Sequence, residues 1–146
     1  KVINGSVSGS TSSGGLNRVD WSLSEPGIDL IILGLGANDM LRGIQPDETE
    51  RNLEQIINVA YYKKIKIILA GMVAPDSHGE KYKKEFDAIY PKLSKKYNLK
   101  LIPFLLEGVA LNPSLNQQDG IHPNIEGTII VSDTIKKSII SYLNYE

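Results

Sequence analysis

The run Asp29-Leu30-Ile31-Ile32-Leu33-Gly34-Leu35 decides the fold of this chain. Its apolar residues follow one another without alternation, which is typical of a strand buried on both faces of a parallel sheet. Two further apolar runs, at 66–70 and 100–104, are predicted as strands, and residues 1–4 read as an opening strand. Amphipathic helical patterns separate the runs. We therefore expect an α/β fold with a parallel sheet between layers of helices.

Helices are predicted where apolar residues recur every three or four positions. A short helix is expected over 16–23, a second from Pro46, a third over 82–97 with a kink or local break at Pro91, and a last one from about Glu126. The inward-facing positions are Leu16, Val19 and Leu23, then Leu53, Ile56, Ile57 and Ala60, then Tyr82, Phe86, Ile89, Tyr90, Leu93 and Tyr97, and finally Val131, Ile135, Ile139 and Tyr142.

Length and composition narrow the class of protein. A chain of 146 residues has the size of one domain, here taken as residues 1–146. The formal net charge of −1 gives no long-range field for nucleic acid or an anionic membrane, so neither is expected as a partner. Without cysteine there is no disulfide or thiolate chemistry. No apolar run is long enough for a transmembrane segment, and no His, Asp and Glu cluster has metal-ligand spacing, so we expect no metal.

Three polar or glycine-rich loops follow predicted strands, at 6–15, 34–43 and 113–124. Ligands of open α/β sheets bind at the carboxyl ends of the strands. We therefore expect the three loops to converge on one crevice.

The third of these loops contains Asp119-Gly120-Ile121-His122. An acid three residues before a histidine can reach the imidazole Nδ1, as the orienting group of a catalytic triad must. Gly120 allows the turn between them. On its own, an Asp-x-x-His sequence more often forms a surface hydrogen bond than two members of a catalytic triad. Gly9 and Asn38 on the neighbouring loops favour the catalytic interpretation.

Several blocks together resemble the SGNH (GDSL-type) ester hydrolases. Gly36-Ala37-Asn38-Asp39 and Asp119-x-x-His122 look like the third and fifth blocks of that superfamily, and the loop 8–12 is similar to the second. The segments 41–46, 86–93 and 120–124 make the chain most similar to its bacterial thioesterase I, lysophospholipase L1 and arylesterase group. The resemblance runs from Val2 to the last helix.

This resemblance implies a flavodoxin-like three-layer αβα fold and a serine ester hydrolase that works through an acyl-enzyme without a cofactor. The implied substrate is a small acyl ester, a thioester or a lysophospholipid. By the resemblance, His122 is the general base and acid, and Asp119 orients it. The Gly9 N–H and the Asn38 amide are implied as the oxyanion-hole donors.

The chain departs from the family in one respect that affects the mechanism. The Gly-Asp-Ser-Leu block that carries the family's nucleophile after its first strand is absent. We expect that βα unit upstream of Val2, either in the same chain, as a clipped but retained peptide, or supplied by a second chain. None of the nearby serines lies in a G-x-S-x-G elbow; these are Ser6, Ser8, Ser10, Ser12 and Ser13. Ser10 also replaces an acidic residue that relatives often carry.

Two other functions stay open on the sequence. One is a catalytically incomplete SGNH-like module, or a fragment, that binds carbohydrate, acyl chains or a partner protein. The other is a nucleotide-binding flavodoxin-like domain, which is disfavoured because the Ser/Gly loop lacks the Lys-Ser/Thr of a P-loop. Asn38-Asp39 on its own is also compatible with a helix N-cap or turn, a role that is sufficient to explain Asp39. His78 is expected as a solvated turn residue. The resemblance implies a periplasmic or secreted protein. The alternative is a cytoplasmic one.

Overall fold

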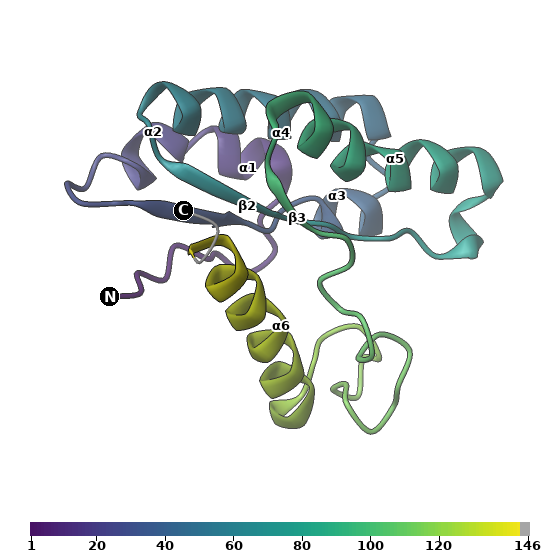
Figure 1. The fold of residues 1–146 in the computed structure, drawn as a ribbon. Helices are drawn as coiled ribbons and strands as arrows, with labels where there is room; N and C mark the ends of the chain where they lie inside the picture. The colour runs from purple at the N-terminus through teal and green to yellow at the C-terminus, as the bar shows by residue number, and fades with distance from the viewer. Residues whose placement is uncertain (144–146) are drawn as a thin grey trace.

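A parallel three-stranded sheet forms the centre of the molecule in the computed structural model, which describes residues 1–143 (Figure 1). Its strands are β1 (Leu30–Leu33), β2 (Lys66–Ala70) and β3 (Lys100–Ile102), in the order β1-β2-β3. Leu30 lies opposite Lys66 and Ile68 opposite Lys100. The run 100–104 yields a shorter strand than predicted, since Pro103 lacks the N–H that a continuing ladder needs.

Helices lie on both faces of this sheet, as Figure 1 shows. One face is covered by four helices, α1 (Ser12–Leu16), α2 (Val19–Ser22), α4 (Pro46–Tyr62) and α5 (Glu80–Tyr97). The other face carries α6 (Ile125–Leu143). The short α3 (Ala37–Leu41) follows the carboxyl end of β1, and the 3₁₀ turn η1 (Asp76–His78) precedes α5. The predicted αβα layering is confirmed.

The main core lies between the sheet and the pair α4 and α5. All four predicted inward positions of α4 are buried, as are four of the six on α5; the buried residues are Leu53, Ile56, Ile57, Ala60, Phe86, Ile89, Tyr90 and Leu93. Pro46 occupies the first turn of α4, where its missing N–H has no helical partner to lose. A kink or a local break was predicted at Pro91; α5 continues through it, so the break does not occur.

The second core is smaller and sits under α6. Ile68, Ala70 and Ile102 are buried there against Ile135, Ile139 and Tyr142, three of the four predicted inward positions of the last helix; Val131 is not part of this core. The strand β1 adds little to this core, because Ile32 is exposed. The prediction that β1 is buried on both faces is therefore wrong for this structure. The helix α6 packs against β3, which lies at the opposite edge of the sheet from β1.

Residues 1–4 do not form the predicted strand. They are irregular, and the Val2 side chain is 95% exposed. A strand requires a neighbour for its N–H and C=O groups. Within residues 1–143 no strand lies on the open side of β1 to provide one.

The predicted helix over 16–23 is divided into α1 and α2. It starts earlier than expected, because Thr11 caps α1 by accepting a hydrogen bond from the Gly14 N–H at 3.2 Å. Residues 12–15, expected as loop, are therefore helical. The chain turns at residues 17–18, and Val19 and Leu23 still reach the core.

Candidate active site

Asp119 and His122 form a direct carboxylate–imidazole pair. His122 Nδ1 lies 2.7 Å from Asp119 Oδ2, while the N–H groups of Ile121 and His122 donate to Asp119 Oδ1 at 2.9 and 3.0 Å. A proton held on Nδ1 leaves Nε2 as an acceptor, which is the arrangement that a general base requires. The pair is built as the sequence spacing predicts.

The turn that carries the pair is held from both ends. The Gln117 N–H donates to the His122 carbonyl at 2.7 Å, and Asn124 caps α6 by accepting from the Gly127 N–H at 3.0 Å. The hydrogen bonds from the His122 N–H, from its imidazole and from the Ile121 N–H lower the pKa of Asp119 to about 2. The carboxylate therefore stays charged at any pH at which an imidazole can act as a base.

Gly9 lies at the third position of a tight turn. The Ser10 N–H closes the turn on the Val7 carbonyl at 3.1 Å, and Gly9 has a φ of 71°, the conformation that favours glycine at this position. The Arg42 guanidinium donates to the Gly9 carbonyl at 2.9 Å. Among residues 1–143 the Gly9 N–H has no acceptor, so it is available to a ligand.

Asn38 sits in the first turn of α3 and reaches the same loop. Its Nδ2 donates to the Ser10 carbonyl at 3.1 Å. A side-chain amide carries two N–H donors, so one of them stays available. Gly9 and Asn38 are thus brought together through Ser10, as the convergence of the loops 6–15 and 34–43 predicts.

Three side chains from η1 and α5 hold the backbone around α3. The Tyr90 hydroxyl donates to the Leu35 carbonyl at 2.9 Å, His78 Nε2 contacts the Met40 carbonyl at 3.0 Å, and the Tyr82 hydroxyl donates to the Ile44 carbonyl at 2.7 Å. His78 is therefore half-buried and bonded rather than a solvated turn residue, because η1 folds back on α3. The tyrosines combine their predicted core role with this polar one.

Tyr90 and Gly36 leave each other no spare room. A Cβ on Gly36 would lie 2.2 Å from the Tyr90 hydroxyl oxygen, and Gly36 has a φ of 110°. Burial, together with the charge of nearby Asp39, raises the pKa of Tyr90, so its hydroxyl remains a donor. Glycine at position 36 is thus required both by its positive φ and by the nearby Tyr90 hydroxyl.

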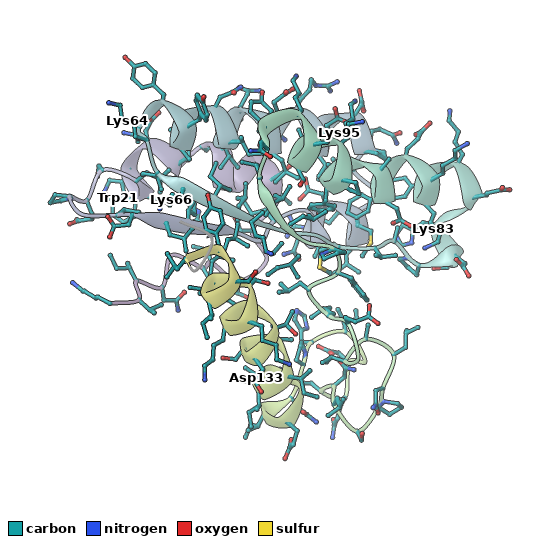
Figure 2. The ribbon with its side chains drawn as sticks, viewed as in Figure 1. Trp21, Lys64, Lys66, Lys83, Lys95 and Asp133 are labelled. Atoms are coloured by element: carbon teal, nitrogen blue, oxygen red, sulfur yellow. The ribbon has the colours of Figure 1, made fainter. Side chains whose placement is uncertain are left out.

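The third loop does not join the other two. No hydrogen bond or ion pair within residues 1–143 links 113–124 to 6–15 or 34–43, and the His122 side chain is 62% exposed. In Figure 1 this loop lies on the α6 side, apart from α1 and α3. Figure 2, in which Asp133 marks α6, shows its side chains in the same outlying part. Within residues 1–143 the hydrogen-bond partner of the His122 imidazole is Asp119 and not a serine hydroxyl.

A buried polar cluster beside Asn38 was not predicted. Asp39 is fully buried and accepts hydrogen bonds from Ser12 and Thr49. Nothing in the spacing of Ser12 and Asp39, 27 positions apart, indicates this contact. The only sequence signal is an acid directly after Asn38, which a helix N-cap explains equally well.

Other kinds of site are not formed by the described residues. Within 1–143 no three His, Asp or Glu side chains are grouped as metal ligands. No helix in that part of the chain has the length and apolar character to cross a bilayer.

The layered parallel sheet defines an α/β protein, and the loop before its last helix carries a carboxylate–imidazole pair. The chain belongs to the GDSL-like lipase/acylhydrolase family, whose model matches residues 1–128. The predicted SGNH membership and fold are thereby confirmed.

Known relatives agree with this assignment. The chain is 37% identical over 145 residues to the thioesterase 1/protease 1/lysophospholipase L1 of Escherichia coli strain K12, covering 99% of the chain and 70% of that protein. It is 34% identical over 142 residues to an arylesterase of Vibrio mimicus, covering 97% and 71%. The psychrotrophic esterase EstA of Pseudoalteromonas sp., solved with monoethylphosphonate as inhibitor, superimposes with a TM-score of 0.91 at 31% identity, covering 97% and 78%.

Proposed function

We propose that this chain is the larger part of a serine ester hydrolase of the carboxylesterase, thioesterase or lysophospholipase type, acting through an acyl-enzyme. The 2.7 Å contact between Asp119 and His122 carries the proposal. It leaves Nε2 free to take a proton from a serine and return it to the leaving group. The reaction needs no cofactor, because the imidazole and the hydrogen-bond donors supply all proton transfer and charge stabilisation.

The Gly9 N–H and the Asn38 amide are proposed as the oxyanion hole. Both groups are uncharged, and each has an N–H that donates to no acceptor within residues 1–143. The Ser10 carbonyl holds the Asn38 side chain against the Gly9 turn. Donors fixed in this way stabilise the negative oxygen of a tetrahedral intermediate without reorganising during the reaction.

The nucleophilic serine is proposed to lie in a βα unit before Val2. The chain spans about 70% of the length of the curated relatives it matches, which supports such a segment. The open side of β1 and the exposed Ile32 provide a place for its strand. The segment can belong to the same chain, here called the full-length protein, to a clipped but retained peptide, or to a second chain.

The substrate is proposed to be a small acyl ester, a thioester or a lysophospholipid. The names of the relatives, which include a thioesterase 1/lysophospholipase L1 and an arylesterase, support these three classes and do not rank them.

The second candidate is a catalytically incomplete module that only binds. The separation of the Asp119–His122 loop from Gly9 and Asn38 favours it. The intact mass and N-terminal sequence of the natural protein separate the two candidates. A mass above 16.1 kDa with Gly-Asp-Ser upstream supports the hydrolase, whereas a natural start at Lys1 supports the binding module.

Hydrolysis then tests the activity itself. The full-length protein is assayed with p-nitrophenyl butyrate and with a butyryl thioester, beside its His122→Ala variant. Gln118→Ala, an exposed change in the same turn, is the matched control. We expect hydrolysis by the full-length protein and by Gln118→Ala, and its loss in His122→Ala. Equal activity in all three would remove His122 from the mechanism.

A further inference from the structure

Asp39 is a fully buried carboxylate that joins three elements of the fold. Its Oδ2 accepts the Ser12 N–H at 2.7 Å, and its Oδ1 accepts the Ser12 hydroxyl and the Thr49 hydroxyl, the latter at 3.3 Å. These donors lie at the start of α1 and in the first turns of α4, while Asp39 itself belongs to α3.

Ser12 is held from a second side as well. Asn52 on α4 donates from Nδ2 to the Ser12 hydroxyl oxygen at 3.0 Å, and Ser12 is itself fully buried. Its hydroxyl thus donates to Asp39 and accepts from Asn52. Hydrogen bonds are stronger in a buried, low-dielectric environment than in water, so this network restrains Ser12 relative to α3.

The cluster is close in sequence to both proposed oxyanion donors. Asp39 follows Asn38 in α3, and Ser12 comes three residues after Gly9. Two further bonds join the same pair of segments on the outer side, from Asn38 to the Ser10 carbonyl and from Arg42 to the Gly9 carbonyl. The loop 9–12 and the helix α3 are therefore held together from the buried side and from the exposed side.

We propose that Asp39 is a positioning residue that sets the distance between the Gly9 N–H and the Asn38 amide. The role rests on the proposed function. Asp39 cannot touch a substrate, because it is fully buried and its carboxylate accepts hydrogen bonds from Ser12 and Thr49 of the protein itself. It acts by fixing the relative position of two donors that lie on separate segments of the chain.

An asparagine cannot accept all the hydrogen bonds that Asp39 accepts in this cluster. The cluster presents three donors, namely the Ser12 N–H and the two hydroxyls, and both carboxylate oxygens accept them. An amide has one acceptor oxygen, so an asparagine can accept either the Ser12 N–H or the two hydroxyls, whichever way the amide is turned. Asp39→Asn therefore keeps the volume and removes at least one of the hydrogen bonds that Ser12 donates to α3.

Kinetics of the full-length protein test this role through a double-mutant cycle of Asp39→Asn and Asn38→Ala. A misplacement of about 1 Å can cost about 10²-fold in rate, so Asp39→Asn is expected to lower kcat roughly 10- to 100-fold with KM within about twofold. In the Asn38→Ala background the same change should cost less than about threefold, because the donor it positions is already gone. Asp47→Asn, an exposed acid at the start of α4, is the matched control and should change neither constant.

The outcomes separate the two proposals. Equal losses of kcat in both backgrounds, or a change confined to KM, would overturn the positioning role while the hydrolase stands. A full-length protein that hydrolyses no ester refutes the proposed function and this role with it. If Asp39→Asn does not fold, Ser12→Ala removes the hydroxyl bond from the other side, and the same kcat loss and non-additivity with Asn38→Ala are expected.

Discussion

The contact between Gly36 and Tyr90 gives a stability prediction that can be worked from the structure. In Gly36→Ala the new Cβ would lie 2.2 Å from the Tyr90 hydroxyl oxygen, at a backbone φ of 110°. A side chain in the left-handed region costs about 1–2 kcal/mol, and overpacking a buried site costs about 1–3 kcal/mol more. The free energy of unfolding should therefore fall by about 2–5 kcal/mol.

Tyr90→Phe separates the two contributions. Removing the hydroxyl leaves the Leu35 carbonyl without its donor, which should cost about 1–3 kcal/mol. It also removes the atom that the new Cβ would meet, and the next ring atom lies 3.4 Å away, an ordinary contact. In the Tyr90→Phe background Gly36→Ala should therefore cost only the backbone contribution of about 1–2 kcal/mol.

Urea unfolding of the four full-length proteins, followed by far-ultraviolet circular dichroism at 25 °C, measures this cycle. The expected coupling is about 1–3 kcal/mol, with the double variant more stable than the sum of the two single changes predicts. An equal cost of Gly36→Ala in both backgrounds would refute the steric argument and leave the backbone conformation as the whole reason for glycine.

Three further predictions concern the site. Asn38→Ala should lower kcat about 10²- to 10³-fold and raise KM much less, since the amide donates mainly to the transition state; steady-state kinetics showing the reverse would make Asn38 a substrate binder. His122→Ala should lower kcat by several orders of magnitude with little change in the urea midpoint, because its side chain is largely exposed; full activity would exclude the general-base role. The pKa of Asp119 is lowered from 3.8 to about 2, so its stabilisation of the turn is complete above about pH 4 and lost as the pH falls towards 2. His122→Ala should raise that pKa only part of the way, because the N–H donors of 121 and 122 remain, and a carboxyl-carbon NMR titration that shows no rise would contradict the side-chain contribution.

The elements that the sequence predicted best are those whose partners lie within the chain. The run 66–70 forms the central strand, and the apolar stripe of α4 is buried at every predicted position. Each of these patterns reflects a burial that nearby elements complete. Asp119 and His122 were equally predictable, because the contact depends on a three-residue spacing and one turn.

The predictions that failed depend on long-range contacts. The strand at 1–4 and the second buried face of β1 both require a neighbour on the open side of the sheet, which the described residues do not provide. The approach of the loop 113–124 to Asn38 depends on where α6 packs, and no residue pattern specifies that. The bond between Ser12 and Asp39 joins positions whose separation carries no periodic signal.

The three carbonyl bonds from His78, Tyr82 and Tyr90 have a consequence for how this region can vary in evolution. They attach the main chain at Leu35, Met40 and Ile44, so the path of α3 does not depend on the side chains that α3 turns towards solvent. Leu41 is one of these, with 44% of its surface exposed. Substitutions at such a position can alter the exposed surface of α3 near Asn38 without moving the asparagine. The backbone at and beside α3 is thus held in place while the exposed side chains of the same helix are free to change.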